Sequence, residues 1–143
     1  MYNKGLKAYQ TVGVSNQAAT ADPHRVIQML LQGALEKMAY AKGAIERKNH
    51  EEKARHLTKA VAIVSALQSA LNLDVKADVA NNLYDLYAFI MDQLTDVSLD
   101  NDVEKIDRTM YIIRQIKEGW DAIPPEAREE GYRMQQQREA VGG

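Results

Sequence analysis

Apolar residues recur along this chain at alternating spacings of three and four, the period of one helical face. Short polar clusters interrupt the pattern and divide it into four segments. We expect helices over residues 23–48, 50–72, 77–97 and 103–123. No stretch alternates apolar and polar residues as a half-buried strand does.

Local signals mark the expected helix ends. Asp22-Pro23 places a side-chain acceptor before the first helix and a proline at its first position, where no N–H is needed. Asn49–Glu52 and Asn101–Glu104 are typical of capping boxes, in which the acidic side chain reaches back to the cap. Pro124-Pro125 should stop the last helix.

Four helices of about twenty residues with short connections favour antiparallel neighbours. The predicted fold is all-α, an antiparallel up-and-down four-helix bundle. An irregular N-terminal arm (1–22) precedes the bundle (23–123), and a flexible C-terminal tail (124–143) follows it.

Composition excludes several classes of function. In 143 residues, 18 Lys and Arg face 20 Asp and Glu, which offers no positive surface for nucleic acid. The lack of cysteine removes thiolate chemistry and fits a reducing compartment. No leader and no apolar run of about 18 residues is evident, so we expect a cytoplasmic protein without membrane insertion. We expect no cofactor, no metal and no catalysis, because no phosphate loop or metal-binding Glu-x-x-His pair occurs.

The histidines leave one alternative open. His56 and Lys59 have the His-x-x-Lys spacing of histidine phosphotransfer bundles, in which an exposed histidine accepts a phosphoryl group. The plainer interpretation is that His56 is a solvated helix residue. His24, in the first turn of the first helix, is expected to be a surface or capping residue.

The second and third helices carry more apolar residues than one bundle core needs. The third alone has Val79, Leu83, Tyr84, Leu86, Tyr87, Phe89, Ile90, Met91, Leu94 and Val97. The N-terminal arm could cover the surplus, a partner's amphipathic segment could bind in a groove there, or two copies could form a homodimer through it.

Several blocks of the sequence resemble flagellin export chaperones of the FliS family. They are the N-terminal Met1-Tyr2 and Leu6–Tyr9, then Ala21–Leu30 with Gly33–Leu35, and further on Leu71–Asp74 and Asn82–Tyr87. The resemblance implies a cytoplasmic bundle that binds the C-terminal segment of newly made flagellin and prevents premature polymerisation. It also implies delivery of flagellin to the cytoplasmic domain of the flagellar type III export gate.

The resemblance also suggests binding residues. Leu6 and Tyr9 match arm positions that the family uses toward flagellin and the export gate, although they could simply pack the arm on the bundle. A second set is expected to line the groove, with the bundle core as the alternative for each member: Leu57, Val61, Val64, Leu83, Tyr87 and Ile90.

Overall fold

The computed structural model describes residues 22–71 and 77–128. Four helices make up nearly all of these residues: α2 (Pro23–Glu46), α3 (His50–Ser69), α4 (Ala77–Asp100) and α5 (Val103–Asp121). No strand occurs in these two stretches. The expected arm up to residue 21, the connection 72–76 and the tail from residue 129 lie outside the described residues.

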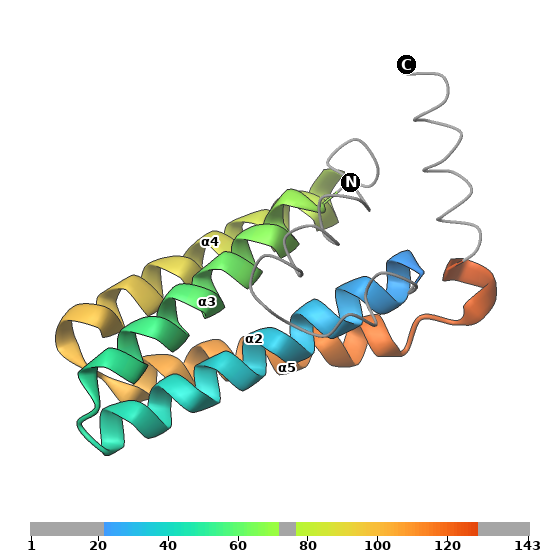
Figure 1. The fold of residues 1–143 in the computed structure, drawn as a ribbon. Coiled ribbons are helices and arrows are strands. Elements are labelled where there is room, and N and C mark those ends of the chain that lie inside the picture. The colour runs from blue at the N-terminus through green and yellow to red at the C-terminus, as the bar shows by residue number, and fades with distance from the viewer. Residues whose placement is uncertain (1–21, 72–76, 129–143) are drawn as a thin grey trace.

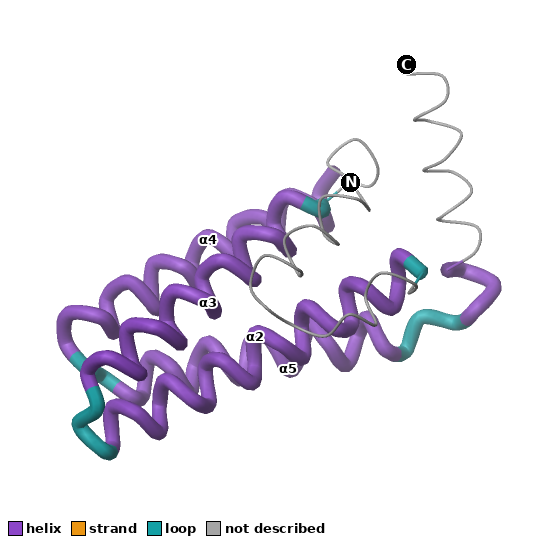
Figure 2. Tube along the Cα trace, viewed as in Figure 1, coloured by secondary structure: helices purple, strands orange, loops and turns teal. Residues whose placement is uncertain are grey.

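The helices form the predicted antiparallel bundle (Figure 1). Each helix runs opposite to the one before it, and α2 lies against both α3 and α5, while α4 completes the ring between α3 and α5. The α2–α3 and α4–α5 connections lie together at one end of the bundle (Figure 2). The fold class predicted from the periodicity is therefore confirmed.

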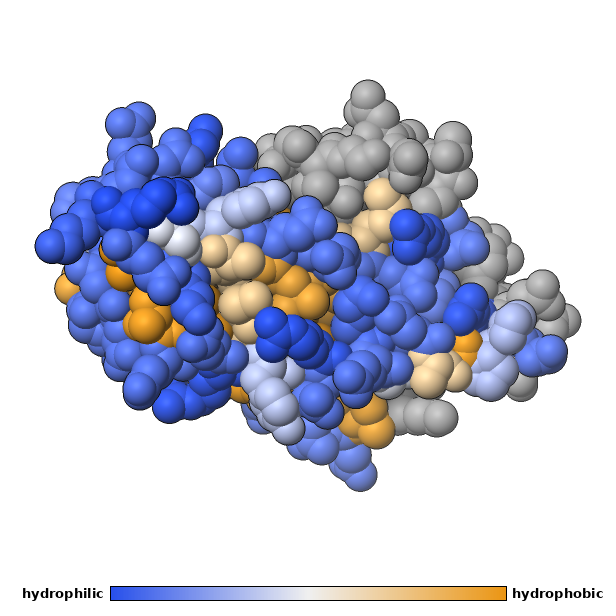
Figure 3. Space-filling model, turned by 90° about the horizontal axis from the view of Figure 1, so that it is seen from below, coloured by the Kyte–Doolittle hydropathy of each residue, from blue (hydrophilic) through white to orange (hydrophobic). Residues whose placement is uncertain are grey.

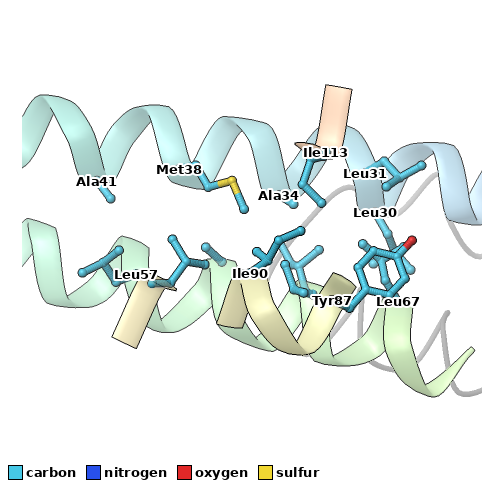
Figure 4. Close-up of a cluster of buried hydrophobic side chains, with 14 of the residues drawn as sticks. Leu30, Leu31, Ala34, Met38, Ala41, Leu57, Leu67, Tyr87, Ile90 and Ile113 are labelled. Carbon is cyan, nitrogen blue, oxygen red and sulfur yellow. The ribbon is translucent and has the colours of Figure 1, made fainter. Parts of the chain in front are cut away.

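The core runs along the bundle axis and receives side chains from all four helices. Figure 4 shows Leu30, Leu31 and Met38 of α2 facing residues of the other helices. Burying each such side chain contributes roughly 1.5–3 kcal/mol relative to leaving it in water. The side chains with no exposed surface include Leu30, Leu31, Met38, Ile63, Val64, Ile90, Val97, Ile106 and Ile113.

The caps predicted at the starts of α2 and α3 form, but the capping box predicted at α3 is incomplete. Asp22 caps α2 as predicted, because its Oδ1 accepts the backbone N–H of Arg25 at 2.8 Å. Asn49 caps α3 in the same way, accepting the N–H of Glu52 at 3.1 Å. The predicted box is otherwise wrong here, since the Glu52 carboxylate pairs with Arg55 and His56 instead of reaching back.

The start of α5 also differs from the prediction. Asp102, not Asn101, is the cap, and its Oδ1 accepts the backbone N–H of Glu104 at 3.0 Å. Asn101 instead adopts the left-handed conformation, with φ of 57°, which asparagine tolerates better than most residues. This residue makes the turn from α4 into α5.

Helix α5 ends at Asp121, and the chain then turns before Pro124. Residues 125–128, which the sequence assigned to the flexible tail, form a helical turn in which Arg128 N–H donates to the Pro124 carbonyl at 3.1 Å. The Arg128 side chain donates from Nε to the Ile123 carbonyl at 2.8 Å. This first part of the expected tail is thus bonded to the end of the bundle.

Candidate partner-binding surface

The groove predicted on α3 and α4 consists mostly of core residues. Four of its six predicted members are at most 4% exposed: Leu57, Val64, Tyr87 and Ile90. Burial raises the pKa of the Tyr87 hydroxyl well above its usual range. Val61 and Leu83 are half-buried and pack against the same core. Leu6 and Tyr9 lie outside the described residues, so the partner contacts of the whole set stay a prediction.

A hollow lies instead between α2 and α5. It is a shallow, open depression of about 480 Å³, and Figure 3, which views the molecule from the side of these two helices, shows apolar surface between hydrophilic residues. Leu35, Ala39 and Met110 supply its apolar part. We call this hollow the α2/α5 groove; its lining is Gln32, Leu35, Glu36, Ala39, Met110, Arg114, Lys117, Glu118 and Asp121.

The signal for the α2/α5 groove was present in the sequence. Leu35 widens the apolar stripe of the first predicted helix, and Met110 belongs to that of the fourth. Both are half-buried against the core, which leaves part of each side chain at the surface. The sequence did not single out this depression, because the apolar width of one helix does not show which neighbouring helix it lies beside.

Charged side chains at one end of the α2/α5 groove neutralise one another. Asp121 accepts hydrogen bonds from Lys117 Nζ and Gln28 Nε2, each at 2.7 Å. The Lys117 ammonium, followed by the Gln28 amide, lowers the pKa of Asp121, so this carboxyl is ionised at neutral pH. The same groove carries Glu36, Glu118 and Arg114. The groove therefore combines an apolar part with charges of both signs.

Six large apolar side chains are exposed on the described surface. Tyr40 and Tyr111, 53% and 61% exposed, directly follow the groove residues Ala39 and Met110 in sequence. Helix α4 carries the other large exposed side chains: Val79, Tyr84, Phe89 and Leu99. Of the surplus apolar residues predicted for this helix, Val79, Tyr84 and Phe89 are found at its surface.

His24 is not the surface residue expected from its position. It is 8% exposed, and its ring stacks on Trp120 with centroids 4.7 Å apart and planes 9° from parallel. Trp120 Nε1 also donates to the His24 carbonyl at 3.0 Å. Burial lowers the pKa of His24, and the Arg128 guanidinium lowers it further.

His56 lacks the exposure that phosphotransfer requires. Its side chain is 14% exposed, its ring packs at a tilt against Tyr40, and its Nε2 lies 3.2 Å from the Glu52 carboxylate. Burial is the largest effect on the pKa of His56 and lowers it. The negative charge of the Glu52 carboxylate beside Nε2 would repel an incoming phosphoryl group. The geometry therefore does not favour His56 as a phosphoacceptor.

In residues 22–71 and 77–128, no three histidine or acidic side chains come together as a metal site would require. Among the helices of those stretches, none is long and apolar enough to cross a bilayer.

The fold and these surfaces define a helical bundle whose candidate site is a surface for binding another protein. Comparison with known proteins agrees: the family model "Flagellar protein FliS" matches residues 5–127. The chain therefore belongs to the FliS family of flagellar secretion chaperones.

Named relatives cover most of the chain. It is 40% identical over 121 residues to the flagellar secretion chaperone FliS of Vibrio cholerae, covering 85% of this chain and 89% of the relative. It is 38% identical over 120 residues to FliSB of Pseudomonas aeruginosa, covering 84% and 95%. For FliS of Salmonella typhimurium the identity is 32% over 124 residues, covering 86% and 92%.

Proposed function

We propose that this chain binds the C-terminal segment of flagellin in the cytoplasm, holds it in a helical form and so prevents premature polymerisation. It acts by binding, without catalysis. Membership of a family whose named relatives are flagellar secretion chaperones supports this proposal. The sequence blocks that resemble flagellin export chaperones, such as Leu6–Tyr9 and Ala21–Leu30, support the same proposal.

The α2/α5 groove is the structural observation that carries the proposal. Its apolar side chains, Leu35, Ala39 and Met110, lie between two long helices, and charged residues surround them. An amphipathic helix binds such a groove by its apolar face, with anchors three and four residues apart. Because both signs of charge occur around the groove, the flanks of the bound helix can carry both signs as well.

A partner that folds on binding suits an export chaperone. The segment loses conformational entropy when it becomes helical, and this loss offsets part of the interaction free energy. The complex therefore has a large interface but moderate affinity. Cargo held in this way can be released for export.

The predicted contacts outside the α2/α5 groove belong to the same proposal. Leu6 and Tyr9 of the arm would take part in flagellin and export-gate contacts. Val61 and Leu83 keep partly exposed surface on α3 and α4 and would extend the binding surface there. A long flagellin segment could reach both surfaces of a bundle of this size.

Calorimetric titration of the full chain with a peptide of flagellin's C-terminal helices tests the proposal. We expect saturable binding, a negative heat-capacity change and a rise in helical circular dichroism beyond the sum of the free components. A peptide of the same composition in scrambled order, which lacks the amphipathic pattern, should not bind. Absence of binding to both the peptide and full-length monomeric flagellin would overturn the proposal.

We further propose that the chain delivers its cargo to the cytoplasmic domain of the flagellar export gate. Co-purification of that domain with the chaperone–flagellin complex is the expected result. The Tyr9→Ala variant should reduce flagellin binding or gate binding and leave the helical circular dichroism unchanged. Loss of the folded bundle in this variant would assign Tyr9 to the core instead.

A further inference from the structure

Two side-chain bridges join α2 to α5, one at each end of the α2/α5 groove. In the first, the Lys–Asp bridge, Lys42 Nζ of α2 pairs with Asp107 Oδ1 of α5 at 2.8 Å. In the second, the Gln–Asp bridge, Gln28 Nε2 of α2 donates to Asp121 Oδ1 of α5 at 2.7 Å. Because α2 and α5 run antiparallel (Figure 1), the two bridges are in register. On each helix they are about four turns apart, from 28 to 42 and from 107 to 121.

The two bridges bound the groove along its length. Every lining residue of α2 lies between residues 28 and 42, and every lining residue of α5 lies between 107 and 121, with Asp121 itself included. Side chains that meet across the gap between two helices fill that gap, so each bridge closes one end of the groove. At 1.5 Å per residue the interval between the bridges is about 21 Å, the length of a helix of about four turns.

The groove is apolar toward one bridge and charged toward the other. Ala39 and Met110 each lie within one helical turn of the Lys–Asp bridge on their own helices. Lys117, Glu118 and Asp121 lie at the opposite end, beside the Gln–Asp bridge. A helix that binds along the groove therefore meets apolar surface with one part and charged side chains with the other.

Negative charge exceeds positive charge in the charged part of the groove. Lys117 and Asp121 neutralise each other at 2.7 Å. Of the remaining charged lining residues, Glu36 and Glu118 are negative and Arg114 is positive. The two glutamates belong to opposite walls, one on α2 and one on α5, so a helix bound in the groove lies between them. A complementary segment carries lysine or arginine at this part of its length.

We propose that the α2/α5 groove holds a flagellin helix of about four turns, with its apolar residues beside the Lys–Asp bridge and its lysine or arginine residues between Glu36 and Glu118. This inference rests on the proposed function and specifies which kind of flagellin segment the groove takes. Apolar anchors three and four residues apart on the bound helix contact Ala39 and Met110. Its basic residues then offset the excess carboxylate charge of the groove.

Charge variants of the full chain test the proposal. Titration with the peptide of flagellin's C-terminal helices at low salt should show roughly two- to fivefold weaker binding for Glu118→Gln and for Glu36→Gln, the effect of one exposed charge pair. Arg114→Gln removes the cation that competes with the peptide and should bind more tightly instead. These differences should shrink at high salt, because exposed charges are screened. Glu51→Gln, at an exposed position of α3, is the matched control and should keep the wild-type affinity.

Spin labels read the position of the bound helix, because the chain has no cysteine of its own. Arg25→Cys places a nitroxide at an exposed position of α2 near the Gln–Asp bridge, and Glu46→Cys places one near the Lys–Asp bridge. In spectra of the isotope-labelled peptide, the label at 25 should broaden the resonances of basic residues. The label at 46 should broaden those of the apolar anchors.

The outcomes separate this inference from the proposed function. If the wild type binds the peptide but the glutamate variants bind it equally well, or if Arg114→Gln binds it more weakly, the groove does not select a basic helix, although flagellin binding stands. The reverse broadening pattern would likewise overturn the placement of the helix. If the wild type binds neither the peptide nor full-length flagellin, the proposed function itself fails, and this inference fails with it.

Discussion

Lys53 Nζ on α3 donates a hydrogen bond to Asn101 Oδ1 at 2.7 Å, across the corner where α4 turns into α5. The same ammonium donates to the Ser98 carbonyl of the last α4 turn at 3.2 Å, and Lys53 is only 9% exposed. A cation at the end of a helix satisfies carbonyls that have no partner within the helix and interacts favourably with its dipole. One side chain thus ties α3 to the left-handed residue that positions α5.

Replacing Lys53 with methionine should destabilise the bundle. The variant keeps a long apolar side chain but loses two charge-assisted hydrogen bonds, so we expect a loss of about 1–3 kcal/mol in the free energy of unfolding. Urea unfolding followed by circular dichroism measures it. Lys59→Met, at a half-buried position of the same helix, is the control and should change stability by under about 0.5 kcal/mol. Equal losses in both variants would show that the contacts to Ser98 and Asn101 contribute nothing.

Gly33→Ala should stabilise the protein. Gly33 lies in the middle of α2, and an added Cβ would meet Ile63 Cδ1 at 3.5 Å, an ordinary van der Waals contact. Alanine stabilises a helix relative to glycine by about 0.5–1 kcal/mol, so the midpoint temperature of thermal unfolding should rise.

Gly119→Ala provides the matched comparison, because nothing lies within 4 Å of its added Cβ in α5. It should give a similar gain from helix propensity alone. If Gly33→Ala lowers stability while Gly119→Ala raises it, α2 and α3 pack more closely at this level than the structure shows.

Stability should fall as the pH is lowered from 7.5 to 5.5. The pKa values of His24 and His56 are lowered in the folded protein, in both cases mainly by burial, so the unfolded chain binds more protons below pH 6.5. Stability from these two residues is complete above 6.5 and is lost as the pH falls toward their folded pKa values. Asp121, whose pKa is lowered, contributes no loss until the pH approaches the ordinary carboxyl range.

Urea unfolding at the two pH values measures this loss. His56→Gln should show a smaller difference between pH 7.5 and 5.5 than the wild type, and a further His24→Phe substitution should reduce it again. A wild-type protein equally stable at both values would contradict the burial of the two rings.

Local chemistry made much of the fold predictable from the sequence. Asp22-Pro23 determines the start of α2 within a few residues, and the apolar period determines which side of each helix is buried. Pairing between distant segments was not predictable in this way. His24 and Trp120 are 96 residues apart, and no neighbouring residue signals that they stack.

Which apolar residues lie at the surface was less predictable than the fold, for the same reason. An apolar residue beside the main apolar stripe of a helix can face the core, a neighbouring helix or a groove. The local sequence pattern is the same in each case. Tyr87 and Ile90 therefore resembled groove residues but are buried, whereas Leu35 and Met110, taken as bundle seam, line the α2/α5 groove. The capping box at Asn49 formed only in part, because the Glu52 carboxylate pairs with Arg55 and His56 and not with its own cap.

The most direct test of the central claim places a charge in the α2/α5 groove. Ala39→Arg puts a long cationic side chain among the groove's apolar residues, and Ala54→Arg puts the same change at an exposed position of α3. Calorimetric titration with the flagellin C-terminal peptide should show affinity at least about tenfold weaker for Ala39→Arg, a loss of about 1.4 kcal/mol, and wild-type affinity for Ala54→Arg. Equal affinity of both variants and the wild type would contradict flagellin binding in this groove.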